Sequence, residues 1–150
     1  MKINGKNLSI YLLSLIFALF FSLMSCEINK AVSNTRLPSS YDTNISYNEA
    51  VRMGKPIAID FYADWCPHCQ AFAPILYDVR KQYEDKYTFV TVNGEKPENA
   101  QLMKEFNITG YPSLFLVNPK TNQKILVDQS LYSSPSALEG EFDKFYSANK

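Results

Sequence analysis

The sequence has no formal net charge, because 15 Lys and Arg residues balance 15 Asp and Glu residues over 150 positions. This balance argues against a protein that coats nucleic acid through a basic surface. Hydrophobic residues make up 46% of the chain and aromatic residues 14%, which excludes a disordered protein. The length gives room for one ordinary domain, with or without an appendage.

Residues for metal and nucleotide sites are also scarce. Three cysteines are too few for a disulfide scaffold, and a single histidine cannot readily complete a four-ligand zinc site. None of the five glycines lies in a phosphate-loop or dinucleotide-binding pattern. We therefore expect the function to depend on a local site.

Residues 1–25 differ in composition from the rest of the chain. Lys2 and Lys6 precede an uncharged run over residues 8–24, which is typical of the basic and hydrophobic regions of a signal peptide. Because the run is apolar on every side, we prefer this interpretation to a buried core helix. Its 17 residues lie at the short limit for spanning a bilayer. Cleavage of the segment and its retention as a membrane anchor therefore both stay open.

Residues 23–26, Leu-Met-Ser-Cys, resemble the lipobox of bacterial lipoproteins, in which the cysteine is lipidated. Cys26 is therefore a predicted lipidation site, with Met24 as a departure from the pattern and plain secretion as a further alternative. The polar residues 26–44 lack an apolar period and predict a flexible linker ahead of a folded domain over residues 45–150. A lipid or an anchor would tether this domain outside the cytoplasm, in a bacterial periplasm or at the cell surface.

The predicted domain alternates helical and strand patterns. Ser46 and Gly54 frame a short helix, and the apolar run over residues 56–62 is typical of a strand buried on both faces. The expected order is helix, strand, helix, strand, helix, strand, strand, helix, over residues 46–53, 56–62, 66–84, 87–93, 97–106, 113–118, 124–128 and 134–148. This order predicts an α/β fold in which a mixed central β-sheet has helices on both faces.

The motif Trp65-Cys66-Pro67-His68-Cys69 lies where the buried strand leads into the next helix. Two thiols at this spacing can form a small disulfide ring, and the free N–H groups of a helix start favour the thiolate of the first. Cys66 is therefore the expected attacking thiol and Cys69 the resolving thiol. Pro67 suits the first helical position, and His68 brings a donor or a positive charge that makes the pair more oxidising.

Other uses of the two cysteines have less support. A haem attachment site needs a histidine after the second cysteine, where this chain has Gln70. A zinc site needs a second cysteine pair, and a purely structural disulfide across so short a loop removes little chain entropy. Copper held by Cys66, Cys69 and His68 stays as an alternative. No metal or organic cofactor is expected beyond a redox-active Cys66–Cys69 disulfide.

Two separated motifs resemble the thioredoxin family. Residues 61–66, Phe-Tyr-Ala-Asp-Trp-Cys, with Cys69 and the Ala-Pro pair at 73–74, are similar to the active-site strand and helix of that family. Residues 110–113, Gly-Tyr-Pro-Ser, are similar to its second signature. The resemblance covers about residues 45–148. It implies the thioredoxin fold and an enzyme, most simply a monomer, that exchanges disulfides with the thiols and disulfides of partner proteins.

Within the family, residues 62–66 and 83–86 are most similar to membrane-anchored, thylakoid-type proteins that face outward and reduce partner disulfides. The Pro-His dipeptide between the cysteines is instead that of the periplasmic oxidant. However, only 42 residues separate Cys69 from Pro112, too few for the helical insertion of that oxidant. The resemblance therefore favours a tethered reductase, fed by a membrane electron donor, over an oxidase.

The resemblance also implies roles for single residues. Asp60 corresponds to the buried acid of the family, which carries a proton for Cys69, although a carboxylate at a solvated strand end is the alternative. Thr91 replaces the frequent lysine beside this acid. Pro112 should be the cis-proline that faces the cysteines, presents the backbone of Tyr111 to an extended substrate and keeps metal off the dithiol.

Two questions stay open at this stage. Trp65 either shields the dithiol or packs in the core. The second functional class is a binding module, either a copper chaperone or an interaction domain that uses the groove at Tyr111 and Pro112 without turnover.

Overall fold

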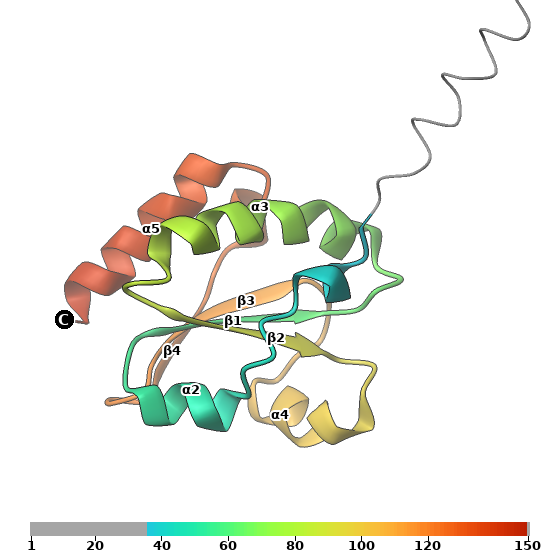
Figure 1. The fold of residues 1–150 in the computed structure, drawn as a ribbon, viewed down its shortest axis with the longest axis horizontal. Coiled ribbons are helices and arrows are strands. Elements are labelled where there is room, and N and C mark those ends of the chain that lie inside the picture. The colour runs from blue at the N-terminus through green and yellow to red at the C-terminus, as the bar shows by residue number, and fades with distance from the viewer. Residues whose placement is uncertain (1–35, 150) are drawn as a thin grey trace, which may run out of the picture. The chain divides into compact units, whose positions relative to one another are not determined.

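The computed structural model describes residues 36–149. In this part of the chain four strands form one mixed sheet in the order β2-β1-β3-β4 (Figure 1). The strands are β1 (Ile57–Tyr62), β2 (Thr88–Asn93), β3 (Ser113–Asn118) and β4 (Gln123–Leu126). β1 pairs in parallel with β2 and antiparallel with β3, which pairs antiparallel with β4. The strand that leads into the cysteine motif is therefore a central one.

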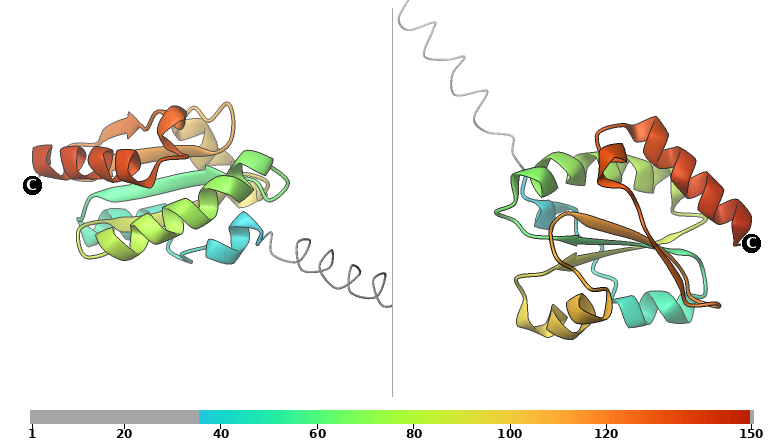
Figure 2. Two further views of the ribbon diagram at one scale, coloured as in Figure 1. Left: turned by 90° about the horizontal axis from the view of Figure 1, so that it is seen from above. Right: turned by 180° about the vertical axis from the view of Figure 1, so that it is seen from behind.

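Helices cover both faces of the sheet (Figure 1, Figure 2). α3 (Pro67–Tyr83) and α5 (Pro135–Ala148) lie on one face. α2 (Tyr47–Met53) and α4 (Ala100–Glu105) lie on the other. The short 3-10 helices are η1 (Pro38–Tyr41), η2 (Pro97–Asn99) and η3 (Gln129–Leu131). This arrangement confirms the predicted α/β fold with a mixed sheet between two helical layers.

All six residues of β1 are buried, because the strand contributes to a core on each face of the sheet. Ala58 belongs to the core under α3 and α5, whose members include Phe72, Leu76, Val79, Leu138 and Phe142. Ile57, Ile59 and Phe61 belong to the core over α2 and α4, with Ala50, Val90, Val92, Phe106 and Val117. Since side chains alternate along a strand, Asp60 shares the face of Ala58 and is carried beneath α3.

Local sequence explains the ends of α2. The Ser46 hydroxyl accepts the N–H of Glu49, and Gly54 ends the helix with a φ of 71°, which glycine adopts without steric cost. The single helix predicted over residues 97–106 is instead η2 followed by α4. There the Asn99 amide donates to the Asn93 carbonyl at 2.7 Å, which ties the first turn to the end of β2.

The folded part begins earlier than predicted, because residues 36–44 pack on the domain instead of continuing the linker. We call residues 38–44 the strap. Two backbone N–H groups of the strap donate to the domain, from Ser39 to Asp64 at 2.9 Å and from Thr43 to Thr91 at 3.0 Å. Two side chains of the domain donate to the strap, from the Tyr62 hydroxyl to Asp42 at 2.6 Å and from Arg80 to the Tyr41 carbonyl at 3.1 Å. These are tertiary contacts, which a polar segment without periodicity does not reveal.

The predicted signal peptide, the lipidation site Cys26 and the first part of the predicted linker lie outside the described residues. Over residues 36–149, no helix has the length and hydrophobicity that a membrane crossing requires.

Candidate active site

Cys66 is the N-cap residue of α3, and Pro67 occupies the first turn of that helix. The Sγ of Cys66 accepts a hydrogen bond from the Cys69 N–H at 3.3 Å. The Cys66 thiol in turn donates to the Tyr111 carbonyl at 3.7 Å. Both cysteines are free thiols. An N–H of the first helical turn thus points at the Cys66 sulfur, which places this sulfur at the N-terminus of α3.

The Cys69 thiol lies deeper than that of Cys66, since the two residues are 1% and 4% exposed. Burial raises the pKa of the Cys69 thiol, and its hydrogen bond with Cys66 and the charge of Asp60 raise this pKa further. The two sulfurs therefore lie in different environments.

Asp60 is buried in the middle of the sheet and is only 4% exposed, so a solvated strand end is excluded. Its Oδ1 has no hydrogen-bond partner among the described residues. Burial, with a smaller contribution from the charge of Asp42, raises the pKa of Asp60 to about 7. Thr91 is its register partner on β2, so an uncharged residue stands beside the acid.

The peptide bond between Tyr111 and Pro112 is cis, as predicted. The hydrogen bond from the Cys66 thiol to the Tyr111 carbonyl joins positions 45 residues apart, so the fold brings the two motifs together. Gln129, which the sequence did not single out, donates from its side chain to the Pro112 carbonyl at 2.8 Å. Gln129 lies in η3, which follows β4, and its side chain contacts the loop that contains Pro112.

Trp65 is 66% exposed, which rules out packing in the core. Its ring meets the Tyr111 ring edge to face, with centroids 6.4 Å apart. Two open hollows of about 440 and 450 Å³ flank the dithiol. The lining of the first includes Trp65, Cys66, Pro67, Met103 and Ile108, and that of the second includes Phe72, Ile75, Pro112, Gln129 and Tyr132. His68 and Tyr111 line both. A largely apolar surface therefore adjoins Cys66.

Metal-ligating side chains are not gathered at the dithiol. Within residues 36–149, no three His, Cys, Asp or Glu side chains form a group that could hold a metal ion. His68 is exposed on the first turn of α3, while the two cysteines are buried. The three-ligand copper arrangement of Cys66, Cys69 and His68 is therefore not formed.

Gly94 is a residue of this region that no sequence pattern predicted. A Cβ at this position would overlap the Tyr111 hydroxyl and lie 2.6 Å from the Tyr111 Cζ. The Gly94 N–H donates to the Tyr62 carbonyl at 2.9 Å, which fixes the backbone against the end of β1. The missing side chain thus makes room for the Tyr111 ring beside Cys66.

Comparisons with known proteins agree with this geometry. The family model of thioredoxin matches residues 39–133. The chloroplast thioredoxin-like protein HCF164 of Arabidopsis thaliana is 36% identical over 80 residues, which are 53% of this chain and 31% of that protein. The thiol:disulfide interchange protein TxlA of Synechococcus elongatus is 26% identical over 113 residues, covering 75% of this chain and 58% of that protein. The chain thus spans less than two thirds of either relative.

Solved structures show the same fold. The J-Trx1 fragment of ERdj5 superposes with a TM-score of 0.59 at 20% identity, covering 69% of this chain and 47% of that chain. Thioredoxin of Trichomonas vaginalis superposes with a TM-score of 0.52 at 28% identity, covering 65% and 86%. With a family model that matches most of the described residues, the chain belongs to the thioredoxin family.

Proposed function

We propose that this chain is a thiol–disulfide oxidoreductase that exchanges disulfides with protein substrates through Cys66 and Cys69. The observation that carries the proposal is the position of the Cys66 sulfur. It receives a helix N–H on one side and faces the Tyr111 carbonyl, beside the cis-proline, on the other. This sulfur lies at a helix N-terminus and next to backbone that an extended polypeptide can pair with.

The reaction follows in two steps. The Cys66 thiolate attacks a substrate disulfide, forms a mixed disulfide and releases one substrate thiolate, which takes a proton from water. The Asp60 carboxylate then accepts the proton of the Cys69 thiol, and the Cys69 thiolate attacks the Cys66 sulfur. The second substrate thiolate leaves. The substrate disulfide is reduced by two electrons, and the Cys66–Cys69 pair is oxidised to a disulfide.

Reduction is the proposed direction. The short spacing between Cys69 and Pro112 and a buried acid with its pKa raised to about 7 support a reductase, whereas Pro67 and His68 favour an oxidant. Equilibration of the dithiol with glutathione buffers separates the two directions. A reductase should have a reduction potential of about −270 mV, and a potential of about −120 mV would contradict the proposed direction.

We further propose that the protein works as a monomer outside the cytoplasm and is tethered through residues 1–25 or through a lipid on Cys26. A membrane electron donor would then restore the dithiol. Fractionation of cells that express the chain tests the lipid: Cys26→Ser should move a lipidated protein from the membrane to the soluble fraction. Unchanged membrane association would favour an uncleaved anchor, and a soluble wild-type protein would favour plain secretion.

Cys69→Ala is expected to trap substrates, because the mixed disulfide on Cys66 then has no resolving thiol. In a chain that also carries Cys26→Ser, we expect about one equivalent of covalently bound model substrate, detected by non-reducing electrophoresis and mass spectrometry. The matched control adds Cys66→Ala and should trap none. A module that binds through the Tyr111–Pro112 groove without turnover would trap no substrate in either variant.

Gly94→Ala is expected to displace the Tyr111 ring and raise KM for a protein substrate, by about tenfold to a hundredfold, because the substrate-facing backbone is misplaced. Steady-state kinetics of insulin reduction measure the effect. Adding Tyr111→Val should recover part of the loss, since it removes the ring that the new methyl group meets. Gly140→Ala is the control, because a Cβ there meets nothing within 4 Å. Wild-type kinetics for Gly94→Ala would show that this glycine does not seat the ring.

A further inference from the structure

Asp64 lies in a tight turn immediately before the attacking thiol. The Cys66 N–H donates to the Ala63 carbonyl at 3.2 Å, which closes a turn with Asp64 and Trp65 at its two central positions. This turn leads from the end of β1 to Cys66 at the start of α3. Its shape therefore decides where the Cys66 sulfur and the Trp65 ring lie.

Three separate parts of the chain hold Asp64. Its carboxylate accepts the Ser39 N–H of the strap at 2.9 Å. Its N–H donates to the Glu95 carboxylate in the loop after β2 at 3.3 Å, and its carbonyl accepts the Gln70 side-chain amide of α3 at 2.7 Å. The side chain and both backbone groups of Asp64 are therefore all used to fix the turn.

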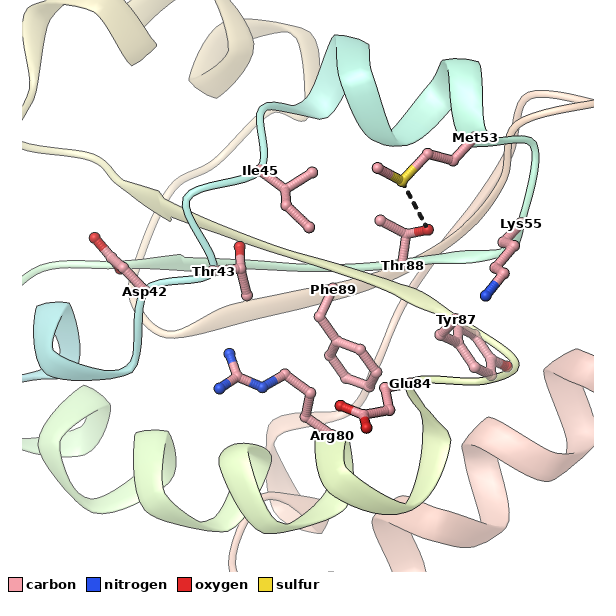
Figure 3. Close-up of a pocket in the computed structure, with 10 residues that line it drawn as sticks. All are labelled: Asp42, Thr43, Ile45, Met53, Lys55, Arg80, Glu84, Tyr87, Thr88 and Phe89. Atoms are coloured by element: carbon pink, nitrogen blue, oxygen red, sulfur yellow. Dashed lines mark hydrogen bonds between the residues drawn. The ribbon is translucent and has the colours of Figure 1, made fainter.

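The strap is itself fixed on the domain, so it can support the turn. The Tyr41 ring packs on the Tyr77 ring of α3 with centroids 5.3 Å apart, and Arg80 donates to the Tyr41 carbonyl at 3.1 Å. Beside the open hollow of about 460 Å³ that borders the strap, Figure 3 shows Arg80 reaching from α3 toward it. Further along, the Thr43 N–H donates to the Thr91 hydroxyl of β2 at 3.0 Å. The bond to Asp64 therefore connects the turn to a segment that α3 and β2 hold.

The two residues after Asp64 both contact Tyr111, the residue before the cis-proline. The Trp65 ring meets the Tyr111 ring edge to face, with centroids 6.4 Å apart. The Cys66 thiol donates to the Tyr111 carbonyl at 3.7 Å. A shift of the turn would therefore move both residues relative to the backbone with which an extended substrate can pair.

We propose that Asp64 is a positioning residue through which the strap holds the turn over residues 63–66, and with it the Cys66 sulfur. The inference rests on the proposed function, because the step that is aligned is the attack of Cys66 on a substrate disulfide. Asp64 transfers no proton and forms no bond with the substrate. Its effect is geometric, and a misplacement of about 1 Å can slow a reaction by about a hundredfold.

The test compares two variants of Asp64 in the reduced full chain that carries Cys26→Ser. Asp64→Ala removes the acceptor of the Ser39 N–H and should slow the attack on a protein disulfide, measured in single turnovers, by about tenfold to a hundredfold. Attack on a small aromatic disulfide should slow by less than about threefold, because it reaches the sulfur without pairing with the Tyr111 backbone. Asp64→Asn keeps an oxygen for the N–H and should recover most of the rate.

The fluorescence of Trp65 gives a second readout, which needs no substrate. Because Trp65 is the only tryptophan of the chain, quenching by acrylamide reports on this turn alone. Asp64→Ala should raise the quenching constant as the ring loses its contact with Tyr111, and Asp64→Asn should not. Asp78→Ala is the matched control, because Asp78 pairs with Lys81 on the exposed side of α3.

Wild-type rates and quenching in Asp64→Ala would overturn the inference, as would a loss in Asp64→Asn equal to that in Asp64→Ala, or an equal change in Asp78→Ala. Equal slowing with the protein and the small disulfide would also overturn it, because lost thiol reactivity affects both substrates. If Asp64→Ala does not fold, Gln70→Ala, which removes another partner of Asp64, must separate the two substrates in the same way or the inference fails. Failure of the proposed function would appear separately, as a wild-type chain that exchanges no disulfide.

Discussion

Replacing Cys66 with alanine is expected to lower the rate of insulin reduction by about a thousandfold or more, because no other described thiol is placed to attack a substrate disulfide. Cys69 cannot substitute for it. The residue is 1% exposed, and burial keeps the pKa of its thiol above the usual range. The Cys66→Ala chain should therefore form no mixed disulfide even in a single turnover, which quenched-flow mass spectrometry can measure.

The matched control for this prediction is His68→Ala. His68 is exposed on the same helical turn and contributes no sulfur. We expect it to change the rate by less than about tenfold, through a modest effect on the stability of the thiolate. Comparable losses in the two variants would indicate that the region binds or folds differently, and full activity of Cys66→Ala would refute the role of this thiol.

Asp60→Asn is expected to change the pH dependence of stability. The pKa of Asp60 is about 7 in the folded protein and 3.8 in the unfolded chain. Between these two pH values the folded state therefore keeps a proton on Asp60 that the unfolded chain releases. The free energy of unfolding of the wild type therefore falls as pH rises from about 4 to about 7. This contribution is fully present below pH 4 and lost above pH 7.

Asparagine has no such titration. The difference in unfolding free energy between Asp60→Asn and wild type should thus shift in favour of the variant by about 4 kcal/mol between pH 4 and pH 8. Urea denaturation at several pH values measures this difference. The change across pH is the diagnostic quantity, because any constant packing cost of the amide cancels. A difference that does not vary with pH would contradict the buried, raised-pKa acid.

The same substitution should slow the release of substrate from the mixed disulfide. Asparagine cannot accept the proton of Cys69, and loss of a general base typically costs about a hundredfold. The attack by Cys66 should change little, since that step does not use Asp60. Stopped-flow measurement of the two steps separates them, and equal slowing of both would argue for a distorted site.

Much of the fold follows from local patterns. The apolar run at residues 57–62 is a strand because such a run, buried on both faces, suits the centre of a sheet, and Ser46 and Gly54 delimit a helix by their own hydrogen bond and dihedral angles. Asp60 was expected to be a buried acid from the resemblance to the thioredoxin family, with a solvated strand end as the alternative, and the structure buries it. The two cysteines lie at a helix start because Pro67 suits the first turn.

The parts that were not predicted depend on contacts between distant segments. The strap has no apolar period, and its place is set by hydrogen bonds to β1, β2, α3 and the loop after β1. Gly94 matters because of a ring 17 positions further along the chain, at Tyr111. Asp42 is one of many polar residues in a stretch that was predicted to be a linker. Its hydrogen bond with the Tyr62 hydroxyl joins positions 20 residues apart, for which no local pattern exists.

The central claim is that Cys66 and Cys69 form a reversible disulfide at the expense of a substrate disulfide. The most direct measurement mixes the reduced chain, carrying Cys26→Ser, with a protein that has one accessible disulfide, quenches with acid and maps the sulfur bonds by mass spectrometry. We expect one Cys66–Cys69 disulfide to appear for each substrate disulfide lost. A substrate that keeps its disulfide while both cysteines stay reduced would contradict the account.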